Sequence, residues 1–441
     1  MNPRLSGDQI SFSERRAKSN PYRLLLWFGL ILGGLWLLWQ IEAGEMQSLN
    51  FTTPVPTRSA ASLVEEARTL FDSGRLLSGP AEVDAIEAYQ EALRLDPDNP
   101  ALLTEMARAQ AYSSALLSTD EARLARMAEA LEAIDRAKEL SPDDSMVRAV
   151  RALVLDWTAT NPLTSDEDRE LYLSLAMEEA VRALDLDSQN SLALTYYAEV
   201  LLDQQNWVQA QQIIEQAVAE NPGSMDVHRV YANVLESLGR YRDSISEFEK
   251  AAEINPNLTF LYLRIGYTYR HLQVFDKALE YFDRAAMINE QNGVNDPGPY
   301  VGIAKTYAQQ GQFFVAARNA EKALEFDPSN SDTYGQLGII YIKSRNYEGA
   351  LPVLKCAVEG CTADENEIGA VDVNGQPLSS TTLEYYLRYG SVLAALSRPG
   401  LNYCPKAMDV MDIVAGRFSD ETTLSVVQEN RVICSRVGES T

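Results

Sequence analysis

Apolar side chains recur along the second half of this chain with a period of 34 residues. Each period holds two stretches whose apolar residues are spaced three or four apart, as on one face of an α-helix. Asn221-Pro222, Asn255-Pro256 and Asn289-Glu290 end three successive periods, and a proline at such a place favours a helix end. A self-similar period of this length predicts a stack of helix pairs, so function is expected on surfaces and not in a catalytic pocket.

Within each period, small and large apolar side chains take fixed places. In the sixth period they are Tyr262, Gly266, Tyr269, Ala278, Phe282 and Ala285, and in the eighth they are Tyr334, Gly338, Tyr341, Ala350, Leu354 and Ala357. The small residues let helices approach closely, and the large ones fill the space between them. The pattern resembles the tetratricopeptide repeat family, which implies an all-α, right-handed superhelical solenoid that binds protein partners.

The earlier periods are longer. Asp96-Pro97, Ser141-Pro142 and Asp187-Ser188 are 45 and 46 residues apart, and the excess is expected in longer turns, at Leu116 to Asp120 and Thr160 to Asp168. We predict about nine helix pairs. Units one to eight cover residues 61–362, and the ninth unit with a capping helix, Glu421 to Arg436, lies within residues 383–441.

The N-terminal segment predicts a membrane anchor. Leu24 to Ile41 are eighteen uncharged, mostly apolar residues, which as a helix span ~27 Å, about a bilayer core. The basic tail, residues 1–23, is then expected in the cytoplasm. The tether 42–60 and the repeats are expected outside it, at the cell surface or in the periplasm. The alternative is a cleaved signal peptide, whose apolar run is usually shorter.

Four cysteines are too few for a disulfide scaffold. Cys404 and Cys434 lie fifteen residues to either side of a turn expected near Ser419, so two antiparallel helices would bring them together in a disulfide that fixes the capping helix. Cys356 and Cys361 either form a local bridge or remain thiols. Neither pair has the spacing of a redox motif or a zinc site.

Residues 363–382 depart from the repeat. Asn374-Gly375 is a turn signal between short apolar segments, which predicts a small hairpin. Such an insertion either contributes to the binding face or is a tolerated surface loop.

The net charge of −25 disfavours nucleic acid as a partner. The sequence has no phosphate-binding glycine loop, no nucleophile elbow and no metalloprotease motif. Of the two histidines, His228 falls at a packing position. We therefore expect no enzyme, no cofactor and no metal.

The first helix of each pair is expected to line the concave groove, because the family's arrays do so. Basic and aromatic residues gather there in units five to seven, at Arg229, Asn233, Arg264, Tyr267, Arg270 and Lys305. Arginine pairs well with carboxylates, so these residues are candidates for binding an acidic segment of a protein partner. Alternatively, they pair with neighbouring acids such as Asp226 and Glu236.

These patterns together predict a membrane-anchored, extracytoplasmic scaffold for protein assembly. Two alternatives remain at this point. One is a chaperone-like holder of translocated chains, and the other is an accessory component of envelope polysaccharide or peptidoglycan metabolism.

Overall fold

The computed structural model describes residues 21–42, 58–77 and 83–439. The chain divides into two units, Met1–Arg58 and Ser59–Thr441. Within the described residues there are twenty α-helices and two short β-strands.

The first unit contributes one helix, α1 (Pro21–Glu42), of 22 residues. Its apolar side chains, among them Leu25, Trp27 and Trp36, are exposed. None of the helices in the described ranges combines the length and the apolar character needed to cross a bilayer. The transmembrane helix expected at residues 24–41 is therefore not confirmed, and most of the expected basic tail and tether lies outside the described residues.

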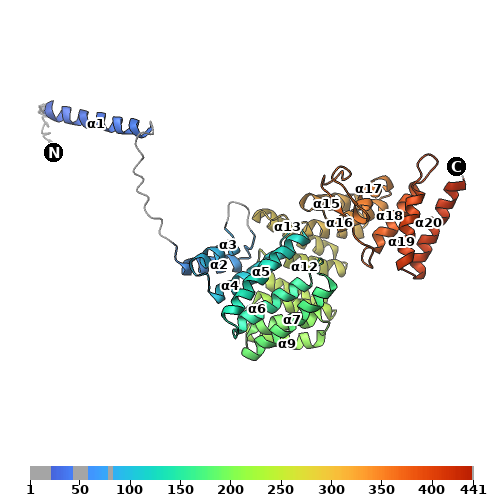
Figure 1. Cartoon of the computed structure of the whole chain (residues 1–441), viewed down its shortest axis with the longest axis horizontal. Coiled ribbons are helices and arrows are strands. Elements are labelled where there is room, and N and C mark those ends of the chain that lie inside the picture. The colour runs from blue at the N-terminus through green and yellow to red at the C-terminus, as the bar shows by residue number, and fades with distance from the viewer. Residues whose placement is uncertain (1–20, 43–57, 78–82, 440–441) are drawn as a thin grey trace, which may run out of the picture. The chain divides into compact units, whose positions relative to one another are not determined.

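The second unit is a stack of helix pairs in which each first helix is followed by its antiparallel partner (Figure 1). The pairs, in chain order, are α2 (Ala60–Asp72) and α3 (Ala85–Leu95), α4 (Pro100–Ser114) and α5 (Asp120–Leu140), α6 (Ser145–Ala159) and α7 (Asp166–Leu186), α8 (Ser191–Asp203) and α9 (Trp207–Glu220), α10 (Met225–Ser237) and α11 (Tyr241–Ile254), α12 (Thr259–His271) and α13 (Phe275–Asn292), α14 (Gly298–Gln309) and α15 (Phe313–Phe326), α16 (Ser331–Lys343) and α17 (Tyr347–Val358), and α18 (Leu383–Leu396) and α19 (Cys404–Arg417). A final helix, α20 (Glu421–Glu439), follows the last pair.

Small residues permit the close helix packing that the sequence pattern predicts. A Cβ atom added at Gly266 of α12 or at Gly302 of α14 would lie 2.6 Å from the ring of Phe282, which is fully buried between the two helices. Gly338 has the same relation to Leu354, at 2.5 Å. Because real Cβ atoms do not approach so closely, any larger residue at these glycines would push the helices apart.

The extra length of the second and third pairs lies mainly in their second helices. α5 and α7 are each 21 residues long, whereas α9, α11 and α15 have 14. Thr119 caps α5 by accepting a hydrogen bond from the Ala122 N–H, and acidic residues fill the first turn, which favours a helix start there. The prediction that longer turns account for the excess is therefore wrong in the main.

The first pair meets the middle of the array. The side-chain amide of Asn255 donates a hydrogen bond to the Phe71 carbonyl at 3.0 Å, and that of Asn257 donates to the Ser73 carbonyl at 2.7 Å. These residues are 184 positions apart in sequence. The C-terminal end of α2 is thus joined to the turn between α11 and α12, so the helix pairs from α2 to α12 close on themselves.

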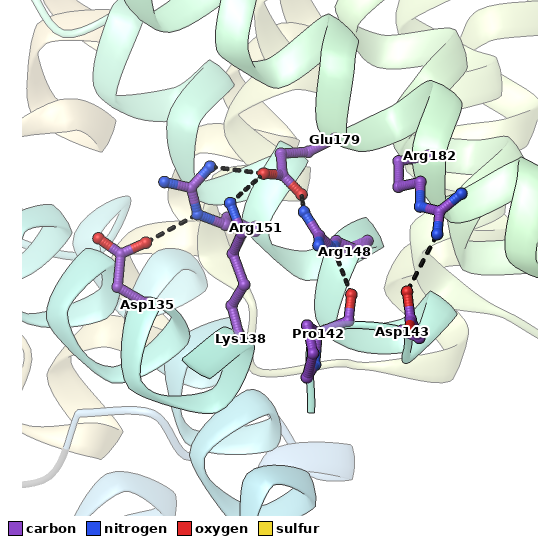
Figure 2. A network of polar contacts seen from close by, with 8 residues as sticks. All are labelled: Asp135, Lys138, Pro142, Asp143, Arg148, Arg151, Glu179 and Arg182. Carbon is purple, nitrogen blue, oxygen red and sulfur yellow. Dashed lines mark hydrogen bonds and ion pairs between the residues drawn. The ribbon is translucent and has the colours of Figure 1, made fainter. Parts of the chain in front are cut away.

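A buried carboxylate ties α5, α6 and α7 together (Figure 2). Glu179 accepts hydrogen bonds from Lys138 at 2.6 Å, Arg148 at 2.8 Å and Arg151 at 2.9 Å, and Arg151 also pairs with Asp135. Burial alone would raise the pKa of Glu179, but the three cations lower it. The carboxylate therefore stays ionised inside the array, with every neighbouring charge paired.

The insertion at residues 363–382 folds back on the eighth pair. β1 (Gly360–Cys361) pairs antiparallel with β2 (Val373–Asn374), and a disulfide joins Cys356 to Cys361. Since Asn374 lies within a strand whose partner follows α17, the turn predicted at Asn374-Gly375 is wrong.

The C-terminal helices form a terminal bundle in which α20 packs on α18 and α19. The structure has the Cys404–Cys434 disulfide expected from the sequence, with the two Cα atoms 5.4 Å apart. It joins the first residue of α19 to α20 and covers the open face of the last pair.

Candidate partner-binding site

The first helices of the closed part of the array surround a cavity of about 610 Å³. Its wall comes from the C-terminal halves of α4, α6 and α8, from α5, α10, α11 and α12, and from the turn after α6. Side chains of very different chemistry share this wall, among them Arg123, Trp157, Asp203, Asn233, Phe260 and Arg264.

One buried ion pair belongs to the wall of the cavity. Arg229 of α10 donates from both terminal nitrogens to Glu199 of α8, with Nη2 to Oε2 at 2.7 Å. The indole of Trp157 donates to the same carboxylate at 3.1 Å. The Arg229 side chain is only 4 % exposed, so its charge is satisfied within the array.

A second charged group lies immediately beyond this pair. Asp226 accepts hydrogen bonds from Arg108, Tyr112 and Tyr196, and the Tyr112 ring stacks on Phe260 with centroids 6.2 Å apart. Burial would raise the pKa of Asp226, but Arg108 and Arg229 lower it. The acid is therefore an ionised centre that joins α4, α8 and α10.

The inner side of the first helices carries two cavities and not one. On the other side of these ion pairs, the N-terminal halves of α4 and α6 line a separate cavity of about 310 Å³, which includes Arg68, Tyr89 and Glu105. Arg108 belongs to the lining of the smaller cavity, and Arg229 and Glu199 belong to that of the larger one. The two cavities therefore have different linings, and the buried Arg229–Glu199 and Arg108–Asp226 pairs connect the residues of one lining to those of the other.

The structure separates the six predicted binding residues into three groups. Arg229, Asn233 and Arg264 line the large cavity, but Arg229 is buried against Glu199, and Arg264 pairs with Glu236 and donates to Asn233. The alternative of internal pairing thus describes both arginines, although Asp226 pairs with Arg108 instead.

Tyr267 and Arg270 lie further along α12. The Arg270 guanidinium stacks 5.5 Å from the Tyr267 ring centroid, and burial raises the pKa of Tyr267 to about 12. Burial also lowers the pKa of Arg270. Lys305, on α14, is 3.7 Å from Asp332, so its ion pair is long.

Sequence reasoning missed the carboxylates of this region. Asp156, Glu199 and Asp203 occupy the inner side of α6 and α8, and Arg108 supplies the partner of Asp226. These carboxylates could have been predicted from charged residues on the apolar face of a first helix. Such a residue needs a partner when it is buried in the closed array.

Three stretches of the chain match models of repeat families. Residues 261–292 and 319–351 match tetratricopeptide repeats, and residues 174–251 match "Anaphase-promoting complex, cyclosome, subunit 3". The chain contains tetratricopeptide repeats. Such repeats typically form non-enzymatic scaffolds, and none of the three matched models is of a catalytic family.

Known proteins resemble parts of this tetratricopeptide repeat array. Anaphase-promoting complex subunit 3 of Schizosaccharomyces pombe is 26% identical over 121 residues, which are 27% of this chain and 18% of that protein. The crystal structure of the APC/C hetero-tetramer Cut9-Hcn1 has a TM-score of 0.51 at 13% identity, with 66% of this chain and 51% of that chain covered. Yeast Tom70 covers 74% of this chain and 65% of its own at 18% identity, with a TM-score of 0.43.

The likeness to Cut9-Hcn1 agrees with an all-α solenoid and extends no further than the fold. This chain spans about half of that structure and less than a fifth of the S. pombe relative.

Proposed function

We propose that this protein is a scaffold whose tetratricopeptide repeats bind an acidic segment of a protein partner on the surface formed by α12 and α14. The residues that would make the contact are Tyr267 and Arg270 of α12, together with Lys305 of α14. An acidic segment would supply carboxylates to the two cations and lie against the tyrosine ring.

Arg270 is the observation that carries this proposal. Its guanidinium lies over Tyr267, and in the described part of the chain no carboxylate pairs with it. By contrast, Arg229 and Arg264 are both paired with glutamates. A partly desolvated cation without an anion is costly to keep in a protein of net charge −25, and a carboxylate from a partner would remove that cost.

The experiment is crosslinking in cells followed by purification of the full-length protein with its partners. An Arg270→Glu variant is compared with wild type and with Arg318→Glu, which makes the same charge change at an exposed position of α15. We expect a specific partner to be lost in Arg270→Glu and retained in Arg318→Glu. Retention of the same partner at wild-type yield in Arg270→Glu would contradict the proposal.

The proposal also places the array in an oxidising compartment outside the cytoplasm. Its support is that all four cysteines are paired, as Cys356–Cys361 and Cys404–Cys434, and disulfides persist in oxidising compartments. An alkaline-phosphatase fusion at the C-terminus should be active, and an inactive but stable fusion would contradict this location.

Attachment to a membrane through the N-terminal segment belongs to the same proposal on sequence grounds. Basic residues precede Leu24 and acidic residues follow Ile41, and apolar side chains of α1 such as Leu26 and Phe28 are exposed. Alkaline carbonate extraction of native membranes tests it, because a membrane-inserted protein stays in the pellet and a peripheral one is released.

A further inference from the structure

Two carboxyl groups beside the large cavity face each other, and one of them is buried. Asp156 of α6 is 1% exposed, and neither of its carboxylate oxygens has a hydrogen-bond partner. Its carboxyl group faces that of Asp203 on α8. Buried carboxylates are rarely left in this state, because an unpaired charge away from water is costly.

Asp203 connects this pair to the cavity. It is exposed and contributes to the cavity wall, next to Glu199 and Leu202. The aromatic rings of Trp157, Phe248 and Phe260 belong to the same wall. A group that enters the cavity can therefore reach Asp203, the outer member of the acid pair, while its apolar part lies against aromatic rings.

The other charges around the cavity already have partners. Arg229 is held by Glu199, and Arg264 pairs with Glu236. Arg123 donates to Asp120 and to the Leu117 carbonyl. Among the acids at the cavity, Asp156 therefore receives no hydrogen bond from these cations.

We propose that the cavity is a binding site for a primary ammonium group, which Asp203 and Asp156 accept and the aromatic wall covers. An ammonium offers three N–H donors and attracts aromatic faces. A metal ion is a poorer fit, since within the described residues no group of three or more acidic, histidine or cysteine side chains is placed to hold one. This site is separate from the Arg270 surface, and its test does not depend on that surface.

The protonation of the pair gives this site a pH dependence. Burial and the charges of Asp203 and Glu199 raise the pKa of Asp156, while Arg229 lowers it. Asp203 has an exposed part, but its carboxyl is desolvated against the cavity wall. This desolvation and Glu199 raise the pKa of Asp203 to about 6, against the effects of Asp156 and Arg229. Without a ligand the pair holds a proton in acid, so the ammonium has to displace it, and binding strengthens as the pH rises above about 6.

Calorimetric titration of the full-length protein with n-pentylammonium at pH 8 tests the proposal. We expect binding to wild type, weaker binding at pH 5, and a loss of affinity of about ten-fold or more in Asp203→Asn, because a hydrogen bond to a charged group is removed. Asp156→Asn is a second variant with the same expected loss. Glu167→Gln removes an exposed carboxylate of α7 and should bind like wild type.

Titration with neutral 1-pentanol distinguishes recognition of the ammonium charge from burial of the pentyl chain in the cavity. Binding of 1-pentanol as tight as that of n-pentylammonium would overturn the proposal. So would unchanged affinity in folded Asp203→Asn, or the absence of ammonium binding to wild type at pH 8.

Two peptides identify the natural carrier of the ammonium group. One has an acetylated amino terminus and a single lysine, and the other has a free amino terminus with norleucine in place of that lysine. Tighter binding of the first supports a lysine side chain, and tighter binding of the second supports a chain terminus. Equal affinity of both peptides and n-pentylammonium supports recognition of the ammonium alone.

Discussion

Arg229 and Glu199 form a bidentate ion pair between two first helices, α10 and α8, in the interior of the closed array. Arg229 is 3% exposed, so this cation of the groove acts within the protein and not at its surface. The pair also shows why charge reversal at Arg229 is a poor test of partner binding, because it would place two buried negative charges together.

Removal of Arg229 should destabilise the protein. Arg229→Ala leaves Glu199 buried without its main partner, so we expect the free energy of unfolding to fall by about 3–5 kcal/mol. Urea denaturation followed by circular dichroism measures it. Arg318→Ala, at an exposed position of α15, should change the free energy of unfolding by less than about 0.5 kcal/mol. Equal stabilities of the two variants would show that the ion pair contributes nothing.

Glu179 should make the free energy of unfolding fall as the pH is lowered. Its folded pKa lies below the ordinary value of 4.5, so the unfolded chain binds a proton more readily than the folded one. The stabilisation is present above pH 4.5 and is lost as the pH falls through the folded pKa. Glu179→Gln should lower the free energy of unfolding by about 3 kcal/mol at pH 7 and flatten its decline in acid. Urea titrations between pH 7 and pH 3 measure this, and parallel curves for variant and wild type would contradict it.

Asp203 should have the opposite effect to Glu179, because its contribution to the free energy of unfolding falls as the pH rises. Its pKa is raised to about 6 in the folded state, so the folded chain holds a proton that the unfolded chain releases. Stability from this group is complete below the ordinary aspartate pKa and is lost as the pH rises through about 6. Asp203→Asn should therefore stabilise the protein at pH 8 by on the order of 1 kcal/mol after allowance for solvent screening. At pH 4 it should have little effect, and the melting temperatures at the two pH values decide between these outcomes.

The Cys404–Cys434 disulfide should stabilise the terminal bundle. It joins cysteines that are 30 residues apart in sequence. Because the bridge restricts the unfolded chain, its removal should lower the free energy of unfolding by about 3–4 kcal/mol. In Cys404→Ser with Cys434→Ser, hydrogen exchange should accelerate in α18, α19 and α20 and remain unchanged in α4 to α10. The matching double variant of Cys356 and Cys361, which are 5 residues apart, should have the smaller effect.

The repeats could be predicted from the sequence because each one is specified locally. The close approach of Gly266 and Phe282 involves positions within one helix pair, and Gly338 and Leu354 repeat it two periods later. The candidate site could not be predicted in the same way. Asp156 and Asp203 come from different pairs, and their proximity depends on how the pairs turn relative to one another.

Closure of the array was likewise beyond the sequence pattern. Asn255 stands at the ordinary end of a second helix, and nothing in the 34-residue period identifies the Phe71 carbonyl as its partner. The pattern indicated that Arg229 would face inward. It could not indicate that buried ion pairs such as Arg229–Glu199 would occupy the interior of the closed array.

The contact between α2 and the turn before α12 also bears on how this protein can change in evolution. An open solenoid gains or loses a helix pair by duplication or deletion without disturbing distant repeats. Here the loss or gain of one pair between α4 and α11 would move Asn255 and Asn257 away from Phe71 and Ser73, and the charged interior would lose its register. We therefore expect this contact to constrain the number of helix pairs from α2 to α12, and we expect the number of later pairs to vary more readily.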